Sequence, residues 1–234
     1  MNGKAFLVKT QKQIKPDELI AVDLHTERYP IGIDLVYANR DHPENIFKTA
    51  IYHDNAKLWL YKDLAEIVFD VALNLFKKYN GILILKDGLR TVEAQMAMQE
   101  TEIVKKNPHW SAPGPSRLLS PPGAGGHPRG MAIDVSVVDA HSNQPWDMGT
   151  VFDHLTTDPK INPASRSYQD FSQDVLDNRH KLESLFLDSA HMMGLEILPL
   201  PSEWWDYRFM PEFSNQFAPL SDHDLPPEMR MVLG

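Results

Sequence analysis

Two side chains that can bind a metal ion stand seven residues apart, at His127 and Asp134. His127 lies between a glycine and a proline, which are typical of a turn, and Asp134 lies in the apolar run 131–138, which is typical of a strand. Side chains on a turn and on the strand that leaves it can point into one pocket, and zinc binds both residue types. The same pair can also fix a turn by a hydrogen bond. The apolar neighbours of Asp134 favour the metal, because a buried carboxylate is costly unless it is paired or coordinates a cation.

A second acidic cluster follows at Glu203 and Asp206, which flank the adjacent residues Trp204 and Trp205. A catalytic zinc site needs three protein ligands, an open position and a nearby carboxylate that acts as a base. The two stretches together can supply that set if residues 203–206 form a turn, which would bring both acids to one side. The alternative is an aromatic anchor, in which the tryptophans pack in the core and the acids face solvent.

Two further charged residues follow segments with an ordered pattern. Arg90 comes after an apolar run and Asp87-Gly88, where a guanidinium near a metal could hold the oxyanion of a tetrahedral intermediate. Asp153 comes after the segment 148–152, where it could hold a cationic group of a substrate. A surface arginine and a capping aspartate explain the same two positions, so the sequence leaves both alternatives open.

The composition indicates an ordinary globular protein. Of its 234 residues, 42% are hydrophobic and 24% are charged, and the length suits one domain over residues 1–234. A formal net charge of −9 argues against nucleic acid or an anionic membrane surface as the main partner. Without cysteine, any metal ligands must be histidine and carboxylates. No window resembles a membrane span and residues 1–12 lack a signal-peptide pattern, so the cytoplasm is the expected location.

Hydrophobic periodicity predicts a mixture of helices and strands around these residues. Helical spacing predicts one helix over 62–79, closed by Asn80-Gly81, and another that starts after Ser172 and ends at Gly194. A helix capped by Thr91 is expected to run to about Lys106. The expected strands are 33–38, 82–85, 131–138 and 195–200, with a hairpin of 49–52 and 58–61.

Three segments of the chain are not expected to form regular structure, and one of them is the polar, irregular segment 139–170. The segment 107–126 contains five prolines and leads directly into His127. A loop of this length inside a compact domain is usually functional or disordered. The tail from Phe217 onward is expected to be an extension that is either docked or loose.

Several motifs, in the same order, resemble the zinc-dependent D-alanyl-D-alanine dipeptidases of the vancomycin-resistance type. The family pattern Ser-x-His-x-x-Gly-x-Ala-x-Asp aligns with residues 125–134, and the family's Glu-Trp-Trp-His aligns with residues 203–206. Its other motifs align with Asp34–Ala38, Asp87–Arg90, Ser120–Pro122 and Met148–Asp153. The matches span roughly residues 30–210.

The resemblance implies a fold and a role for each candidate residue. The fold would be α+β, a single domain with a small central antiparallel sheet flanked by helices. One Zn²⁺ per chain would be bound by His127, Asp134 and Asp206. Glu203 would be the general base on a metal-bound water, Arg90 would stabilise the oxyanion, and Asp153 would hold the free amino terminus of the substrate. The implied reaction is hydrolysis of the small dipeptide D-Ala-D-Ala, a cell-wall precursor.

The sequence departs from the family pattern at two positions. Asp206 stands where the family has its third zinc ligand, a histidine, and a site of one histidine and two carboxylates can also accept a harder metal such as Mn²⁺. Gly125 stands where the family has a serine near the substrate, so one hydroxyl hydrogen bond is lost. The alternatives to a D-Ala-D-Ala dipeptidase are therefore a related carboxypeptidase of peptidoglycan peptides and a non-catalytic binding relative whose metal site has decayed. The sequence leaves the oligomeric state open.

Overall fold

A five-stranded sheet forms the centre of the structure, a computed structural model that describes residues 11–114, 117–156, 158 and 160–233. In spatial order the strands are β2 (Ile31–Ile33), β4 (Gly81–Asp87), β5 (Ala132–Asp139), β7 (Asp206–Phe209) and β6 (Ile197–Pro199). Neighbouring strands are antiparallel except β2 and β4, which are parallel. The predicted α+β class with a central antiparallel sheet is confirmed, but the parallel pairing of β2 with β4 was not predicted.

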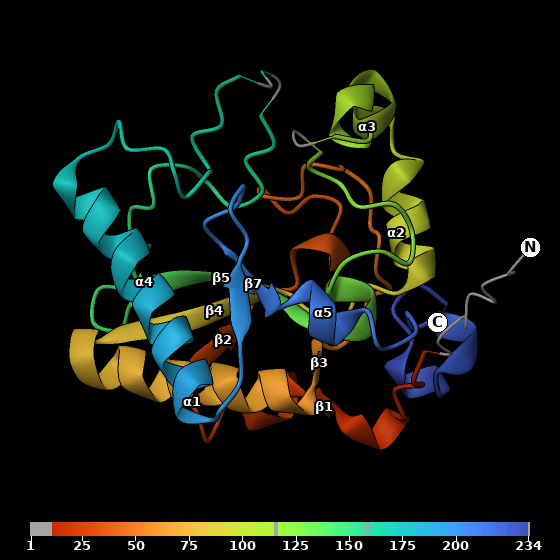
Figure 1. The fold of residues 1–234 in the computed structure, drawn as a ribbon, viewed down its shortest axis with the longest axis horizontal. Coiled ribbons are helices and arrows are strands. Elements are labelled where there is room, and N and C mark those ends of the chain that lie inside the picture. Colours follow the sequence, from red (N-terminus) through yellow and green to blue (C-terminus); the bar gives the residue numbers. More distant parts are fainter. Residues whose placement is uncertain (1–10, 115–116, 157, 159, 234) are drawn as a thin grey trace, which may run out of the picture.

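Two long helices pack on one face of this sheet (Figure 1). Helix α1 (Lys62–Tyr79) ends at Asn80, which is left-handed at φ 54°, as the predicted helix end requires. Helix α4 (Gln173–Met192) begins after Ser172, whose hydroxyl accepts a hydrogen bond from the Val175 amide. Both helices were predicted with these caps. They contact each other as well as the sheet, so they cover the same face.

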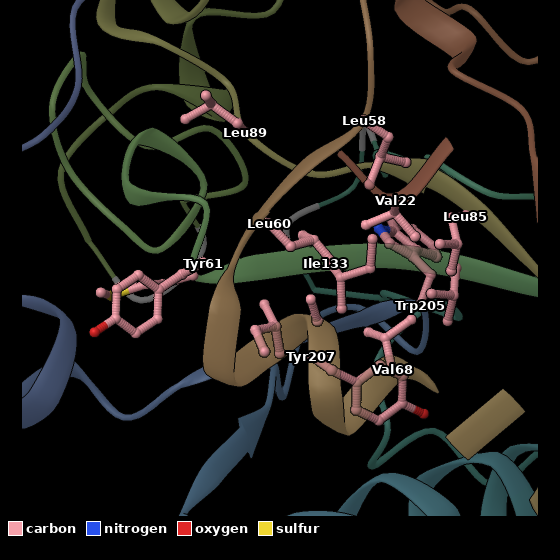
Figure 2. Close-up of a cluster of buried hydrophobic side chains, with 14 of the residues drawn as sticks. Val22, Leu58, Leu60, Tyr61, Val68, Leu85, Leu89, Ile133, Trp205 and Tyr207 are labelled. Carbon is pink, nitrogen blue, oxygen red and sulfur yellow. The ribbon is translucent and has the colours of Figure 1, made fainter. Parts of the chain in front are cut away.

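The core lies between the sheet and these helices (Figure 2). Val68 of α1 meets Leu85 of β4 and Ile133 of β5, and all three are fully buried. Tyr207 of β7 stacks on Phe186 of α4 with ring centroids 3.8 Å apart. Because successive side chains of a strand point to opposite faces, the neighbours of these apolar residues face the other side of the sheet, which carries the polar residues of the site.

Three of the expected elements are wrong. The segment 58–61 forms no hairpin with 49–52. Instead β3 (Trp59–Tyr61) pairs with β1 (Leu19–Ala21), and Tyr61 leads directly into α1. The strand expected over 33–38 ends at Ile33, and a 3-10 turn follows at Val36–Ala38. The helix expected from Thr91 to Lys106 is split.

The split helix has a local cause. Helix α2 (Val92–Gln99) ends before Thr101, whose backbone is extended at ψ 150° and whose hydroxyl donates to the Met98 carbonyl, and α3 (Glu102–Lys106) starts after it. Thr91 occupies the position before α2, but its hydroxyl makes no capping hydrogen bond within the described residues. The other 3-10 turns are Pro16–Glu18, Val22–His25, Pro108–Trp110, His127–Arg129, Asp222–Asp224 and Pro227–Met229.

The C-terminal tail is docked. It follows the short helix α5 (Pro211–Ser214), and the Leu220 amide donates to the Pro128 carbonyl at 2.6 Å. The buried carboxylate of Asp222 accepts hydrogen bonds from the amides of residues 231, 232 and 233. Among the described residues, no helix is long and apolar enough to cross a membrane, and the N-terminal run that bears on location lies outside them.

Candidate active site

His127 is fixed by a short turn at the start of β5. Its 3-10 turn ends at Gly130, which is left-handed at φ 61°, and a β-carbon there would lie 3.0 Å from the Tyr61 amide nitrogen. The glycine therefore lets the turn approach β3 closely. The Nδ1 atom of His127 donates to the Gly88 carbonyl at 2.8 Å, which leaves Nε2 to face the site.

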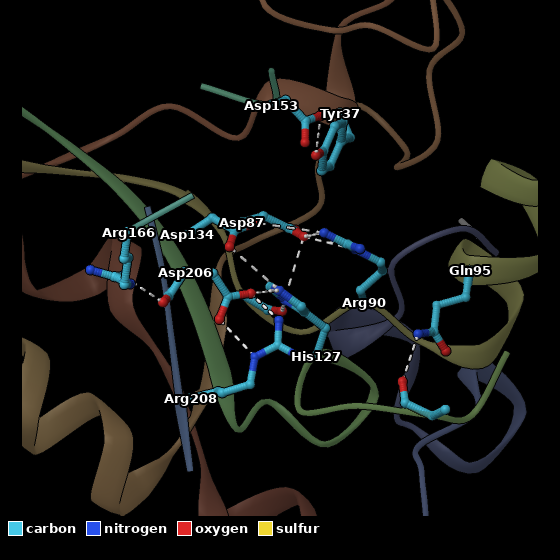
Figure 3. A network of polar contacts seen from close by, with 12 residues as sticks. Tyr37, Asp87, Arg90, Gln95, His127, Asp134, Asp153, Arg166, Asp206 and Arg208 are labelled. Atoms are coloured by element: carbon cyan, nitrogen blue, oxygen red, sulfur yellow. Dashed lines mark hydrogen bonds and ion pairs between the residues drawn. The ribbon is translucent and has the colours of Figure 1, made fainter. Parts of the chain in front are cut away.

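Two carboxylates face that Nε2 atom from adjacent strands (Figure 3). Asp134 of β5 and Asp206 of β7 are paired across the sheet, on the face away from α1 and α4. The Nε2 atom of His127 lies 3.5 Å from Oδ1 of Asp134 and 3.3 Å from Oδ2 of Asp206. Both carboxylates are buried, at 2% and 0% exposure. The structure thus brings together three residues that the sequence singled out from two distant stretches.

This cluster has the donors and the charge to accept a cation. Oδ1 of Asp134 is buried and has no hydrogen-bond partner among the described residues, although such an atom is costly to leave unpaired. Burial and the nearby Arg90 lower the pKa of His127, but the Asp134 and Asp206 carboxylates outweigh them and raise it to about 10. Excess negative charge at this point therefore favours an added positive charge, either a proton or a metal ion.

A third carboxylate, Asp87, lies on the other side of the imidazole. Donor atoms of Asp87, His127 and Asp134 lie within 4.8 Å of one another, so these three could hold an ion, whereas Asp206 does not belong to a group with that spacing among the described residues. However, Asp87 faces Nδ1 of His127, at 3.6 Å, and that atom already donates to Gly88. Asp87 also accepts hydrogen bonds from Tyr52 and, twice, from Arg90. We therefore assign Asp87 to orienting its neighbours rather than to ligation.

Arg90 is not a surface residue. Its Nε and Nη2 atoms hold Oδ2 of Asp87 at 2.9 and 2.6 Å, and Nη2 lies 3.5 Å from Asp134. The guanidinium lies over the Tyr37 ring, 5.5 Å from its centroid. Burial lowers the pKa of Arg90, but the Asp87 carboxylate and other neighbours raise it well above its ordinary value, so the charge is permanent.

Glu203 and Asp153 line the same cavity as His127. Burial, followed by the Asp206 and Asp134 carboxylates, raises the pKa of Glu203 well above its ordinary value. Burial also raises the pKa of Asp153 to about 7, although its hydrogen bond from the Tyr37 hydroxyl, at 2.6 Å, opposes the shift. The expected turn brings Glu203 to the cavity, while both tryptophans are buried as an aromatic anchor would be. The aromatic-anchor interpretation is therefore confirmed for the tryptophans, but it is wrong for the acids, which are buried rather than exposed to solvent.

The cavity itself is small. Its volume is about 110 Å³, comparable to an engineered cavity of about 150 Å³ that binds benzene. Its walls carry the six candidate residues and further loop residues, including Gly125. A cavity of this size suits a small molecule better than an extended peptide.

Sequence reasoning missed Arg208. Its guanidinium donates two hydrogen bonds to the Asp206 carboxylate, from Nε to Oδ1 at 2.7 Å and from Nη2 to Oδ2. Burial opposes ionisation of Asp206, but Arg208 and His127 outweigh it and hold the pKa of Asp206 below its ordinary value. The signal was present, since residues two apart on a strand share a face.

Arg166 was also missed, and it holds the turn that carries Glu203. Its guanidinium donates to the carbonyls of Leu200, Trp204 and Asp206 at 2.9–3.0 Å and to the Glu183 carboxylate at 2.8 Å. Arg166 comes from the irregular segment 139–170, where no periodicity indicates a role.

Replacing Arg166 by leucine should therefore destabilise the protein and displace the turn. We expect a loss of about 3 kcal/mol in the free energy of unfolding, because three carbonyls lose their donor and a buried unpaired group costs about 1–3 kcal/mol. Urea unfolding measures this. Arg40→Leu is the control, since Arg40 is 72% exposed and its ion pair is with an exposed neighbour. Equal stability of the two variants would contradict the assigned role.

The sequence matches known proteins over a range that includes the whole site. Residues 21–221 match the family model described as D-ala-D-ala dipeptidase. The D-alanyl-D-alanine dipeptidase of Escherichia coli (strain K12) is 27% identical over 208 residues, which are 84% of this chain and 91% of that protein. Every residue of the cavity discussed above lies within the matched range.

Proposed function

Because the chain belongs to the D-Ala-D-Ala dipeptidase family, we propose that it is a metal-dependent dipeptidase that hydrolyses D-Ala-D-Ala or a closely related dipeptide. The observation that carries the proposal is the convergence of His127 Nε2 with the Asp134 and Asp206 carboxylates, in a cavity that Glu203 also lines. The small volume of that cavity favours a dipeptide over a longer peptidoglycan peptide. The cytoplasmic location stays a prediction.

The metal would be held by Nε2 of His127 and by one oxygen each of Asp134 and Asp206. These are ligand types for zinc, and two carboxylates would also suit Mn²⁺. When bound, the ion would polarise the scissile carbonyl and acidify water in the site. One neutral histidine and two carboxylates with a divalent ion make a formally neutral centre. Arg208 returns one positive charge, so the Asp206–Arg208 pair is equivalent in charge to one neutral imidazole.

The other residues act on the substrate and on protons. Glu203 takes a proton from the attacking water as oxygen bonds to the scissile carbonyl carbon, and it then protonates the leaving amine as the C–N bond breaks. Burial and the neighbouring carboxylates raise the pKa of Glu203 above its ordinary value, which makes it a stronger base than an exposed glutamate. Arg90, held in place by Asp87, stabilises the negative charge on the former carbonyl oxygen. Asp153 holds the substrate ammonium group.

This role for Asp153 predicts a pH dependence of substrate binding. With a pKa of about 7, Asp153 becomes neutral below that pH and loses its attraction for an ammonium group. The KM for D-Ala-D-Ala should therefore rise as the pH falls from 8 to 6. Steady-state kinetics of the wild type and Asp153→Asn measure this, and the variant should show a high KM without that rise. The same slope in both proteins would place the titrating group elsewhere.

The activity itself is tested with purified, zinc-loaded protein and D-Ala-D-Ala, with release of D-alanine as the readout. L-Ala-L-Ala and a peptidoglycan stem pentapeptide are the comparison substrates. We expect D-Ala-D-Ala to be hydrolysed most efficiently. Preference for the stem peptide would indicate the carboxypeptidase alternative. No hydrolysis with zinc or manganese at any pH from 6 to 9 would reject a dipeptidase and leave a binding relative.

A further inference from the structure

Arg208 has hydrogen-bond donors that Asp206 does not use. A guanidinium carries five N–H donors in a planar fork, and Asp206 takes one from Nε and one from Nη2. Nη1 donates no hydrogen bond to any residue that the structure describes. The side chain is 15% exposed and lines the cavity of His127 and Glu203. One edge of Arg208 therefore holds Asp206, and the edge at Nη1 is available to a ligand.

Gly125 leaves space next to that free edge. Its backbone is left-handed at φ 87°, and a β-carbon built on it would lie 3.6 Å from Nη1 of Arg208 and 3.4 Å from the Ser120 hydroxyl. The Nη1 atom thus lies next to the place that a side chain at position 125 would occupy. Because glycine has none, a small group of the substrate can enter there. The space left by the missing side chain at Gly125 is therefore the space that Nη1 of Arg208 borders.

Asp153 and Arg208 lie on opposite sides of the His127 cluster (Figure 3). A dipeptide at neutral pH is a zwitterion, with an ammonium group at one end and a carboxylate at the other. The proposed partner of the ammonium group is Asp153. A carboxylate at the other end needs a cation, and arginine binds carboxylates through paired, charge-assisted hydrogen bonds. The two ends of the cavity therefore match the two ends of a dipeptide in charge.

We propose that Nη1 of Arg208 binds the free C-terminal carboxylate of the dipeptide in the space beside Gly125. Arg208 is then a specificity-determining residue, because it selects substrates whose scissile bond is followed by a single residue with a free carboxylate. The inference rests on the proposed dipeptidase function and adds the group that recognises the second end of the substrate. The same arginine keeps Asp206 in place, so it links substrate recognition to the proposed metal site.

The test compares D-Ala-D-Ala with its C-terminal amide, which is the same size but lacks the carboxylate charge. In the zinc-loaded wild type we expect kcat/KM for the free dipeptide to exceed that for the amide by about 10- to 100-fold, the effect of a charge-assisted hydrogen bond. In Arg208→Gln this ratio should fall to near one, mainly through KM for the free dipeptide. Arg208→Lys, which keeps the charge but not the fork, should retain part of the ratio.

Binding supplies a readout that does not depend on turnover. Calorimetric titration of Glu203→Gln protein with the dipeptide and with the amide should show the same preference, and Glu203→Gln combined with Arg208→Gln should lose it. If Arg208 only positioned Asp206, Arg208→Gln would weaken both ligands in proportion and the ratio would persist. That result would overturn the inference.

The matched control is Arg117→Gln, because Arg117 is another arginine that lines the cavity. It should leave the ratio of free dipeptide to amide unchanged, and a loss of the ratio in this variant would assign the carboxylate to Arg117 instead. If Arg208→Gln does not fold, the wild-type ratio and Arg208→Lys decide. Hydrolysis of dipeptide and amide at equal rates by the wild type overturns the role of Arg208 and leaves the dipeptidase intact. Failure to bind or hydrolyse either ligand overturns both proposals.

Discussion

Replacing Glu203 by glutamine is expected to lower kcat for D-Ala-D-Ala by about a thousandfold, within the range that a general acid–base group contributes. Glutamine has nearly the same shape but cannot accept and return a proton. The fold should survive, because the side-chain oxygens of Glu203 accept no hydrogen bond from any residue that the structure describes. Removing a carboxyl group that lies beside Asp206 and Asp134 also relieves repulsion between like charges.

The measurement pairs kinetics with metal content, so that a lost base is not confused with a lost metal. Glu203→Gln should bind as much zinc as the wild type, since the proposed ligands are His127, Asp134 and Asp206. The control is Glu212→Gln, which changes an exposed glutamate in α5. A variant that loses its zinc together with its activity would show that Glu203 is itself a ligand. A variant that retains near wild-type kcat would remove Glu203 from the reaction.

The parts of the structure that the sequence predicted well are those fixed by local interactions. Helix α1 has a clear apolar stripe and a residue that can adopt the left-handed conformation at its end, so its bounds follow from residues 62–80 alone. Helix α4 has a serine at its start and Gly194 after its end. Asp134 could be expected to be buried because it interrupts an apolar strand, and it is 2% exposed.

Errors arose where pairing depends on distant residues. β3 has the pattern of any short strand, and nothing within residues 49–61 shows that its partner is 19–21 rather than a nearby segment. The parallel pairing of β2 with β4 is equally non-local. Likewise, the periodicity of 92–106 is helical, but a single threonine at 101 ends one helix and begins the next.

The same distinction holds for the site, where some residues could be predicted from motifs in the sequence and others could not. Motifs in order indicated which residues converge, and the paired positions of Asp134 and Asp206 explain how two stretches meet. Arg166 could not be found, because its hydrogen bonds go to backbone carbonyls that have no sequence signature. Arg208 could have been found, because any acid that replaces a neutral ligand in a buried site needs a compensating charge, and the same strand face offers one two residues later.

Replacing His127 by alanine is expected to remove both metal binding and much of the stability of the site. The imidazole lies between the Asp134 and Asp206 carboxylates, so its loss leaves two buried like charges without their shared partner. Breaking a buried ion pair in this way costs about 3–5 kcal/mol. Urea unfolding of metal-free protein measures this loss, with His223→Ala as the control because His223 is exposed in the tail.

The effect of zinc on unfolding then separates a metal site from a simple ion pair. Zinc at a thousandfold excess over its Kd should raise the free energy of unfolding of the wild type by about 4 kcal/mol, because the ion binds the folded state only. In His127→Ala this increment should vanish, whereas His223→Ala should keep it, and a chelator should reverse it in both the wild type and the control. If zinc stabilises His127→Ala as much as the wild type, then the ion binds elsewhere, and the convergence of His127 with two carboxylates is only structural. If the increment depends on His127 and on Asp134 but survives Asp206→Asn, the Asp87 carboxylate completes the site instead, since it is the remaining acid within reach of both.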